Sequence, residues 1–262
     1  MKKLLAGVMA TALLLAGCSK PAETTSVVDS SKEEASSVKE DPAAKSEGVM
    51  SYAEYEAAKV DDEVTVEGYV QAKQSYWEDE GKGKATLYLQ DLDGAYFVYN
   101  INITEDDYKK MAEGQKVQVK GYKTEFNGEV EIDGSDASYT IEDGNWVADA
   151  EDLTDVLGNE DEAKKYMNQK FSVKGYEVVA SDDGNAFTYN YDGSGTQGDD
   201  LYFKVSDGTN TMTFTVESYL TDSSTDVYKA VEALKVGDKI NAEGFLYWYE
   251  GINPHITSLT VE

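Results

Sequence analysis

The chain has 262 residues, of which 40% are hydrophobic, and its formal charge is −28 at pH 7. This length allows one large or two small hydrophobic cores. All 23 basic residues are lysine, so the chain lacks the arginines with which many proteins bind phosphates. The composition therefore counts against nucleic acid as a partner, and the acidity is typical of a soluble exported protein.

The N-terminus has the order of a secretory signal. Two lysines precede an apolar stretch, 4–15, that is shorter than the roughly 18 residues of a membrane-spanning helix. The stretch ends in Leu15–Cys18, which resembles the lipobox of bacterial lipoproteins. This resemblance implies removal of the signal peptide 1–17, acylation of Cys18 (diacylglycerol and palmitate) and anchoring in the bilayer at the extracytoplasmic face of the cell membrane. The alternative is an ordinary secretory signal with a chance cysteine.

Residues 18–48 form the expected lipid anchor and a tether. The segment is rich in Ser, Thr, Glu, Lys and Ala and has almost no large apolar side chains. Such a segment cannot bury enough surface to offset the entropy of ordering it, so we expect it to be disordered. Cys18 is the only cysteine, which excludes an internal disulfide.

An internal repeat divides the rest of the chain into two similar units, 49–143 and 144–262. Internal similarity of this kind indicates two copies of one structural unit. The matching segments are 64–70 with 171–177, 87–94 with 201–208, and 113–122 with 236–245.

Both units predict the same order of elements. A helix with a Ser-x-x-Glu capping box at Ser51 comes first, then three alternating strands, a short helix, and two strands joined by a tight turn. The predicted elements of the first unit are strands Glu63–Lys73, Ala85–Asp91 and Ala95–Ile103, a helix capped by Thr104, a strand after Gly114 and a turn at Asn127-Gly128. Those of the second unit are a helix between Leu153 and Met167, a helix containing Val227, Val231 and Leu234, a strand after Gly237 and a turn at Glu250-Gly251.

This order is that of the OB-fold, a five-stranded Greek-key barrel. The segment 87–132 also resembles the small OB domains of exported bacterial proteins, including domains attached to extracellular nucleases. The resemblance rests on Tyr88–Asp91, the Asp93-Gly94 turn, Gly114–Gly121 and Phe126–Gly128; the second unit departs from it at 205–206 and 249–251. It implies a mainly β protein with two tandem OB barrels, each with a helix before strand 1 and another between strands 3 and 4.

The residues for catalysis or metal binding are few. His255 is the only histidine, and carboxylates are so common that no catalytic pair stands out. Turns rich in Asp and Gly, such as 91–94, 182–184 and 192–200, do not meet the EF-hand spacing. We therefore expect no enzyme activity, no cofactor and no metal site, although the sequence leaves weak calcium binding open.

Aromatic residues are the best candidates for a ligand site. An OB barrel binds ligands across strands 2 and 3, between the loops that join strands 1–2 and 4–5. In the predicted strand 245–249, alternate rings lie on opposite faces, and one of these faces must be core. The candidates are Tyr76, Trp77, Phe126, Asn127, Tyr189, Tyr191, Tyr247, Trp248, Tyr249 and Asn253. They also fit a structural reading in which the rings only cover the barrels.

The sequence thus predicts a membrane-anchored, non-catalytic binding protein. Rings beside Asp and Asn suit a glycan or a protein partner. Two alternatives stay open, namely a single-stranded nucleic-acid-binding OB protein and an accessory or structural subunit of a membrane complex. The oligomeric state does not follow from the sequence.

Overall fold

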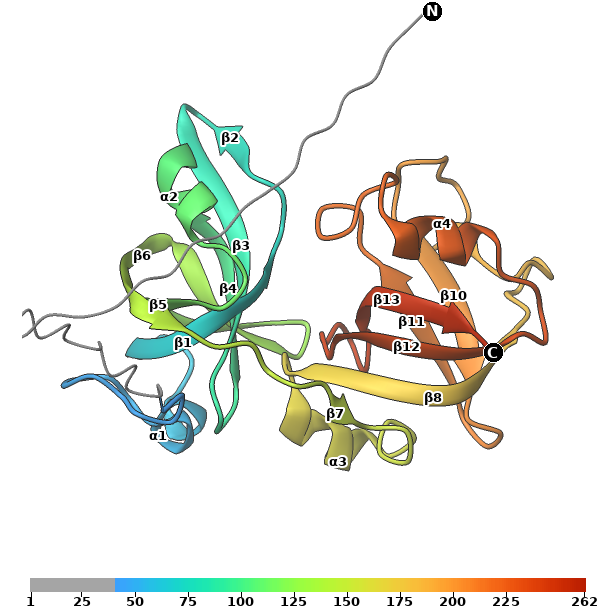
Figure 1. The fold of residues 1–262 in the computed structure, drawn as a ribbon, viewed down its shortest axis with the longest axis horizontal. Coiled ribbons are helices and arrows are strands. Elements are labelled where there is room, and N and C mark those ends of the chain that lie inside the picture. The colour runs from blue at the N-terminus through green and yellow to red at the C-terminus, as the bar shows by residue number, and fades with distance from the viewer. Residues whose placement is uncertain (1–40) are drawn as a thin grey trace, which may run out of the picture. The chain divides into compact units, whose positions relative to one another are not determined.

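The strands form two separate hydrogen-bonded sheets (Figure 1). The computed structural model describes residues 41–262. The signal peptide 1–17, Cys18 and the tether as far as residue 40 lie outside the described residues. Among residues 41–262, no helix is long and apolar enough to cross a membrane.

The first sheet closes into a barrel made of β1, β3, β4, β5 and β6. In chain order, the elements of this half are α1 (Tyr52–Ala57), β1 (Glu63–Lys73), β2 (Trp77–Asp79), β3 (Lys82–Gln90), β4 (Ala95–Asn102), α2 (Glu105–Lys110), β5 (Gln115–Phe126) and β6 (Glu129–Asn145). Strand β1 pairs with both β3 and β5, β3 pairs with β4, and β6 pairs with β5 and, in parallel, with β4. This is the predicted OB-fold order.

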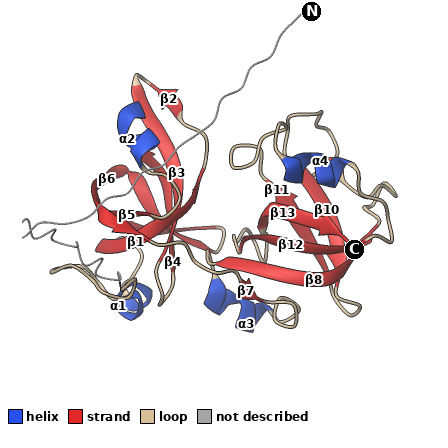
Figure 2. Ribbon diagram, viewed as in Figure 1, coloured by secondary structure: helices blue, strands red, loops and turns tan. Residues whose placement is uncertain are grey.

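The second sheet repeats this topology with β8, β10, β11, β12 and β13. Its elements are β7 (Glu151–Asp152), α3 (Glu160–Ala163), a 3-10 turn (Lys164–Tyr166), β8 (Lys170–Val179), β9 (Thr188–Tyr189), β10 (Leu201–Ser206), β11 (Thr211–Val216), α4 (Asp226–Glu232), β12 (Lys239–Phe245) and β13 (His255–Val261). Strand β8 pairs with both β10 and β12, and β11 lies parallel to β13. Strands predominate and helices are short in both halves (Figure 2). The predicted fold class is confirmed.

Local sequence signals account for several element boundaries. The Ser51 hydroxyl accepts a hydrogen bond from the Glu54 amide at 3.3 Å, and the Glu54 carboxylate accepts one from the Ser51 amide at 2.8 Å. This is the predicted capping box. The Asn127-Gly128 turn has φ values of +50° and +91°, as a two-residue hairpin between β5 and β6 requires.

Two predicted elements differ from the structure. The helix expected between Leu153 and Met167 is confined to α3 and one 3-10 turn, because Leu153 first hydrogen-bonds to the strand residue Ser172 and Asn159 then caps a new helix. The strand expected to reach Tyr249 ends at Phe245. The chain turns there, with the Tyr247 amide bonded to the Phe245 carbonyl, and 246–254 form a long loop.

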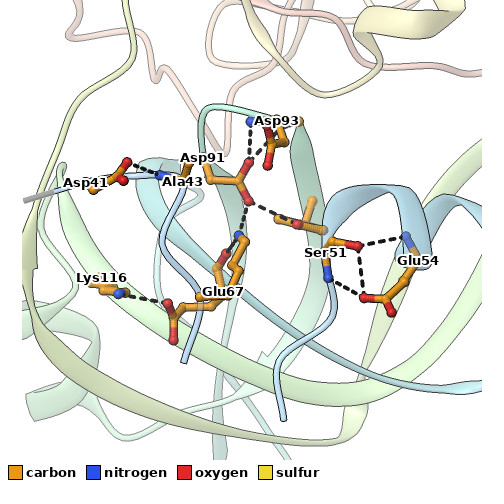
Figure 3. Close-up of polar contacts among 11 residues, drawn as sticks. Asp41, Ala43, Ser51, Glu54, Glu67, Asp91, Asp93 and Lys116 are labelled. Atoms are coloured by element: carbon orange, nitrogen blue, oxygen red, sulfur yellow. Dashed lines mark hydrogen bonds and ion pairs between the residues drawn. The ribbon is translucent and has the colours of Figure 1, made fainter. Parts of the chain in front are cut away.

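The last residues of the expected tether contact the first barrel, unlike a disordered segment. Lys45 donates to the Glu67 carbonyl at 2.7 Å and forms an ion pair with Asp91, whose side chain is fully buried. Asp91 also accepts hydrogen bonds from the amides of Asp93 and Gly94 in its own turn (Figure 3). A buried carboxylate requires such partners, so the turn and the N-terminal segment fix each other.

Each barrel has its own hydrophobic core, and a third cluster joins them. On β3, Leu87 and Leu89 face the core of the first barrel, whereas Tyr88 points the other way. Tyr88 is nonetheless fully buried, because it packs with Phe97 of β4 and Phe245 of β12. Side chains from the two barrels therefore contact each other through aromatic rings.

Candidate functional site

A cavity of about 400 Å³ lies on the second barrel, where an OB barrel usually binds its ligand. Its floor is formed by β10 and β11, and its walls by the 1–2 loop (180–200) and the 4–5 loop (246–254). The lining residues are Ser181, Asp182, Asp183, Thr188, Tyr191, Asp192, Gly193, Tyr202, Phe203, Lys204, Thr213, Tyr249, Ile252 and Asn253. Its volume falls within the range of small-molecule sites.

Three tyrosine rings from three different segments line this cavity. Tyr191 of the 1–2 loop is 82% exposed, Tyr249 of the 4–5 loop is 44% exposed, and Tyr202 of β10 is half-buried. Burial and the nearby Asp200 raise the pKa of Tyr202 to about 12, so its hydroxyl keeps its proton at neutral pH. The rings provide flat apolar surfaces and hydroxyl groups within the same cavity.

Carboxylates stand beside these rings. Asp182 accepts a hydrogen bond from the Lys204 ammonium at 2.6 Å, which lowers the pKa of Asp182. Two hydrogen bonds from Ser194 lower the pKa of Asp192. Asp183 has no hydrogen-bond partner for its carboxylate among residues 41–262, so this group remains available as an acceptor.

Asn253 supplies an amide to the same cavity. Its side-chain oxygen accepts a hydrogen bond from the buried Thr215 hydroxyl at 2.7 Å, and its backbone amide donates to the Tyr247 carbonyl at 3.0 Å. These two bonds fix the residue within the 4–5 loop. The amide nitrogen of the side chain is then left as a donor toward a ligand.

The equivalent face of the first barrel is covered by the second barrel. Tyr88 contacts Phe245 with 4.6 Å between ring centroids, and Phe97 contacts Tyr247 with 5.3 Å between centroids. His255 closes the contact, with its Nδ1 2.7 Å from the Tyr88 hydroxyl. Two copies of the fold therefore leave one open ligand face.

Several titratable groups are buried where the barrels meet. Glu129 is fully buried, and it accepts hydrogen bonds from the Asn168 side chain at 2.5 Å and the Trp248 amide at 3.0 Å. Burial raises its pKa to about 8 despite these bonds. Burial also raises the pKa of Glu217 to about 7 and lowers that of His255 to about 3. At neutral pH, Glu129 and His255 are therefore largely uncharged in this contact, and burial holds part of Glu217 in its protonated form.

The structure brings three of the ten candidate residues together in the cavity: Tyr191, Tyr249 and Asn253. Phe126 lies next to them, with 6.0 Å between its ring centroid and that of Tyr249. Asn127 follows Phe126 in the turn.

The other candidates lie elsewhere. Tyr247 stacks on His255, and Trp248 is 4% exposed against the first barrel. Tyr76 and Trp77 lie in the 1–2 loop of the first barrel, where Tyr76 lines a separate open cavity of about 450 Å³. Tyr189 donates to Glu232 of α4 at 2.7 Å, outside the cavity.

Tyr202, Lys204 and Asp183 line the cavity but were not predicted from the sequence as binding residues. A signal for the first two was present, because residues that alternate with the core positions Leu201, Phe203 and Val205 must face outward on β10. Asp183 carried no such signal, since one acidic turn residue resembles another. Among residues 41–262, no cluster of three or more His, Cys, Asp or Glu side chains is placed to hold a metal ion.

No family model and no curated protein matches this chain. Solved structures with a related arrangement do match. The tetrameric p202 HIN2 domain is 13% identical over 78% of this chain and 96% of its own, with a TM-score of 0.33. A murine DNA-binding protein bound to double-stranded DNA is 14% identical over 75% of this chain and 94% of its own, with a TM-score of 0.34. A Replication Protein A heterotrimer bound to single-stranded DNA is 12% identical over 80% of this chain and 68% of its own, with a TM-score of 0.27.

The expectation that nucleic acid is an unlikely partner does not stand. Two of the three structures contain DNA, and a p202 HIN1 domain was also solved with a 12-mer duplex. The expectation was wrong because it rested on net charge. Net charge sums the whole surface, whereas a ligand meets only the local charge of one face.

Proposed function

We propose that this protein is a non-catalytic binding protein, anchored to the outer face of the membrane by Cys18, that binds a glycan on its second barrel. The observation that carries the proposal is the shared cavity of Tyr191, Tyr202, Tyr249 and the acceptor Asp183. It lies at the position where OB barrels take their ligands.

The chemistry of this cavity matches a sugar ring. The CH groups on one face of a sugar carry partial positive charge, and the negative face of a tyrosine ring attracts them. Hydroxyl groups at the edge of the sugar need both acceptors and donors. Asp183 supplies a carboxylate, while Asn253 and Lys204 supply N–H groups.

The placement of His255 supports binding without catalysis. This residue, the only histidine in the sequence, is buried between the barrels against Tyr88, and its lowered pKa keeps it neutral. It therefore cannot reach a ligand in the cavity as a general base. The anchor at Cys18 rests on the lipobox resemblance alone.

A glycan array probed with the full chain in detergent tests this proposal, followed by calorimetric titration of any glycan that binds. We expect Tyr249→Ala to weaken binding about tenfold, since it removes a stacking ring. Tyr122→Ala is the matched control, because Tyr122 is 46% exposed, close to the 44% of Tyr249, but lies on the first barrel. Absence of any glycan ligand, or equal binding by Tyr249→Ala, would refute the proposal.

A second candidate is single-stranded nucleic acid at the same face. The exposed rings of Tyr191 and Tyr249 favour it, because bases stack on such rings in other OB barrels. Lys204 would then face the phosphates. Anisotropy of a labelled oligo-dT with the full chain distinguishes the two, since nucleic-acid binding weakens steeply with salt and glycan binding does not.

A further inference from the structure

We infer that the ligand is an oligomer that occupies two adjoining subsites, the cavity of the second barrel and a ring pair formed by Phe126 and Tyr249. This inference rests on the proposed function and specifies the ligand further. It assigns a binding role to the first barrel, whose own ligand face is covered.

The ring pair lies where the 4–5 loops of the two barrels meet. The centroids of Phe126 and Tyr249 are 6.0 Å apart with 52° between the ring planes, and the side chains are 54% and 44% exposed. Large apolar rings held together at the surface are typical of contact sites. Because Tyr249 also lines the cavity, the ring pair adjoins the cavity.

Hydrogen bonds hold the two loops together as one unit. The Glu250 amide donates to the Asn127 carbonyl at 2.7 Å, and the Trp248 amide donates to the Glu129 carboxylate at 3.0 Å. Each bond joins a residue next to Tyr249 to a residue near Phe126. The ring pair is therefore ordered before a ligand arrives, which reduces the entropy lost on binding.

Close packing at Gly128 also holds the two loops in the arrangement that places Phe126 beside Tyr249. A Cβ atom at this position would lie 2.9 Å from the Trp248 ring, and φ is +91°. Only glycine allows both the turn and this approach. Trp248, predicted from sequence as a ligand residue, thus supports the ring pair from below the surface.

Phe126 does not itself line the cavity, so a sugar held there leaves Phe126 uncovered, whereas a longer chain can contact both. Affinity should therefore rise with chain length until both subsites are filled. Phe126 should contribute only to the longer ligands, and Tyr249 to both short and long ones. This pattern separates a second subsite from a ring that only stabilises the loop.

The test is calorimetric titration of the full chain with oligomer series, from dimers to hexamers, of N-acetylglucosamine, glucose and galacturonic acid. We expect wild type to bind longer chains about tenfold more tightly than dimers. Phe126→Ala should bind dimers as wild type does but should lose the tighter binding of longer chains. Phe126→Tyr should keep the tighter binding of longer chains. Tyr122→Ala should behave as wild type.

The failures of the two proposals are distinguishable. No binding of any series by wild type, together with no glycan bound on the array, would refute the glycan function itself. Binding of dimers without a gain in longer chains would refute only the second subsite. An undiminished gain in Phe126→Ala would refute it as well, and binding of oligo-dT in place of all three series would assign the cavity to nucleic acid.

Discussion

The hydroxyl of Tyr88 lies 2.7 Å from Nδ1 of His255, and this contact joins two barrels that are far apart in sequence. Both groups are buried, and burial keeps both uncharged, since it raises the pKa of Tyr88 and lowers that of His255 to about 3. The contact is therefore a hydrogen bond between neutral partners. It also covers the face on which the first barrel would otherwise bind a ligand.

Removing the Tyr88 hydroxyl should destabilise the protein. In Tyr88→Phe, Nδ1 of His255 loses its partner in a buried place, and we expect the free energy of unfolding to fall by about 1–3 kcal/mol. Urea unfolding followed by tryptophan fluorescence measures the change. Tyr122→Phe, on the exposed side of β5, should leave the stability as it is, and a Tyr88→Phe variant as stable as this control would contradict the role of the contact.

Stability should fall as the pH rises above 6.5. Burial raises the pKa of Glu129 to about 8 and those of Glu131 and Glu217 to about 7, whereas an unfolded glutamate titrates near 4.3. The folded state then binds more protons than the unfolded state, so its stability is lost as the pH rises through the folded pKa values. We expect a fall of about 2 kcal/mol between pH 6.5 and 8, measured by urea unfolding.

Between pH 6.5 and 8 the stability should change through the buried carboxyl groups and not through His255. The pKa of His255 is lowered to about 3, so its stabilising contribution is complete above the unfolded value of about 6.5 and is lost only at lower pH. Glu129→Gln should make the decline shallower, and Glu125→Gln at an exposed site on β5 should not. If the free energy of unfolding falls with pH equally steeply in wild type and in Glu129→Gln, Glu129 does not titrate between pH 6.5 and 8.

The N-terminal segment should detach when Lys45 is removed. Lys45→Ala leaves the buried Asp91 without its cation, and we expect a loss of about 1–3 kcal/mol together with faster proteolysis near residue 45. Lys120→Ala is the control, because its ion pair with Glu63 is half exposed and contributes little. Limited proteolysis and urea unfolding of both variants give the comparison. If both variants resist protease equally, the contact does not hold the segment.

Asp183 should act on binding and not on stability. Its carboxylate lines the cavity and is exposed, so we expect Asp183→Ala to weaken glycan binding about tenfold at unchanged melting temperature. Asp93→Ala, an exposed turn residue of the first barrel, is the matched control. A loss of melting temperature in Asp183→Ala would instead indicate a structural role.

Much of the fold follows from short-range signals in the sequence. The predicted strand Glu63–Lys73 has the bounds of β1, and Ser51, Thr104 and the Asn127-Gly128 turn act as expected. These features depend on alternation, capping and turn geometry, all of which involve neighbours along the chain. The order of strands and helices in both barrels likewise follows from such local signals.

The candidate site followed from the sequence only in part, because the tertiary contacts decide which rings are exposed. Alternation along 245–249 defined two faces but not which of them was buried. The structure ends the strand at Phe245, covers Trp248 with Gly128 and leaves Tyr249 exposed, a result that depends on residues more than 100 positions away. The sequence by itself determined two OB barrels. Only the packing of one barrel on the other decided which ligand face stays open, since burial there depends on contacts that no local pattern encodes.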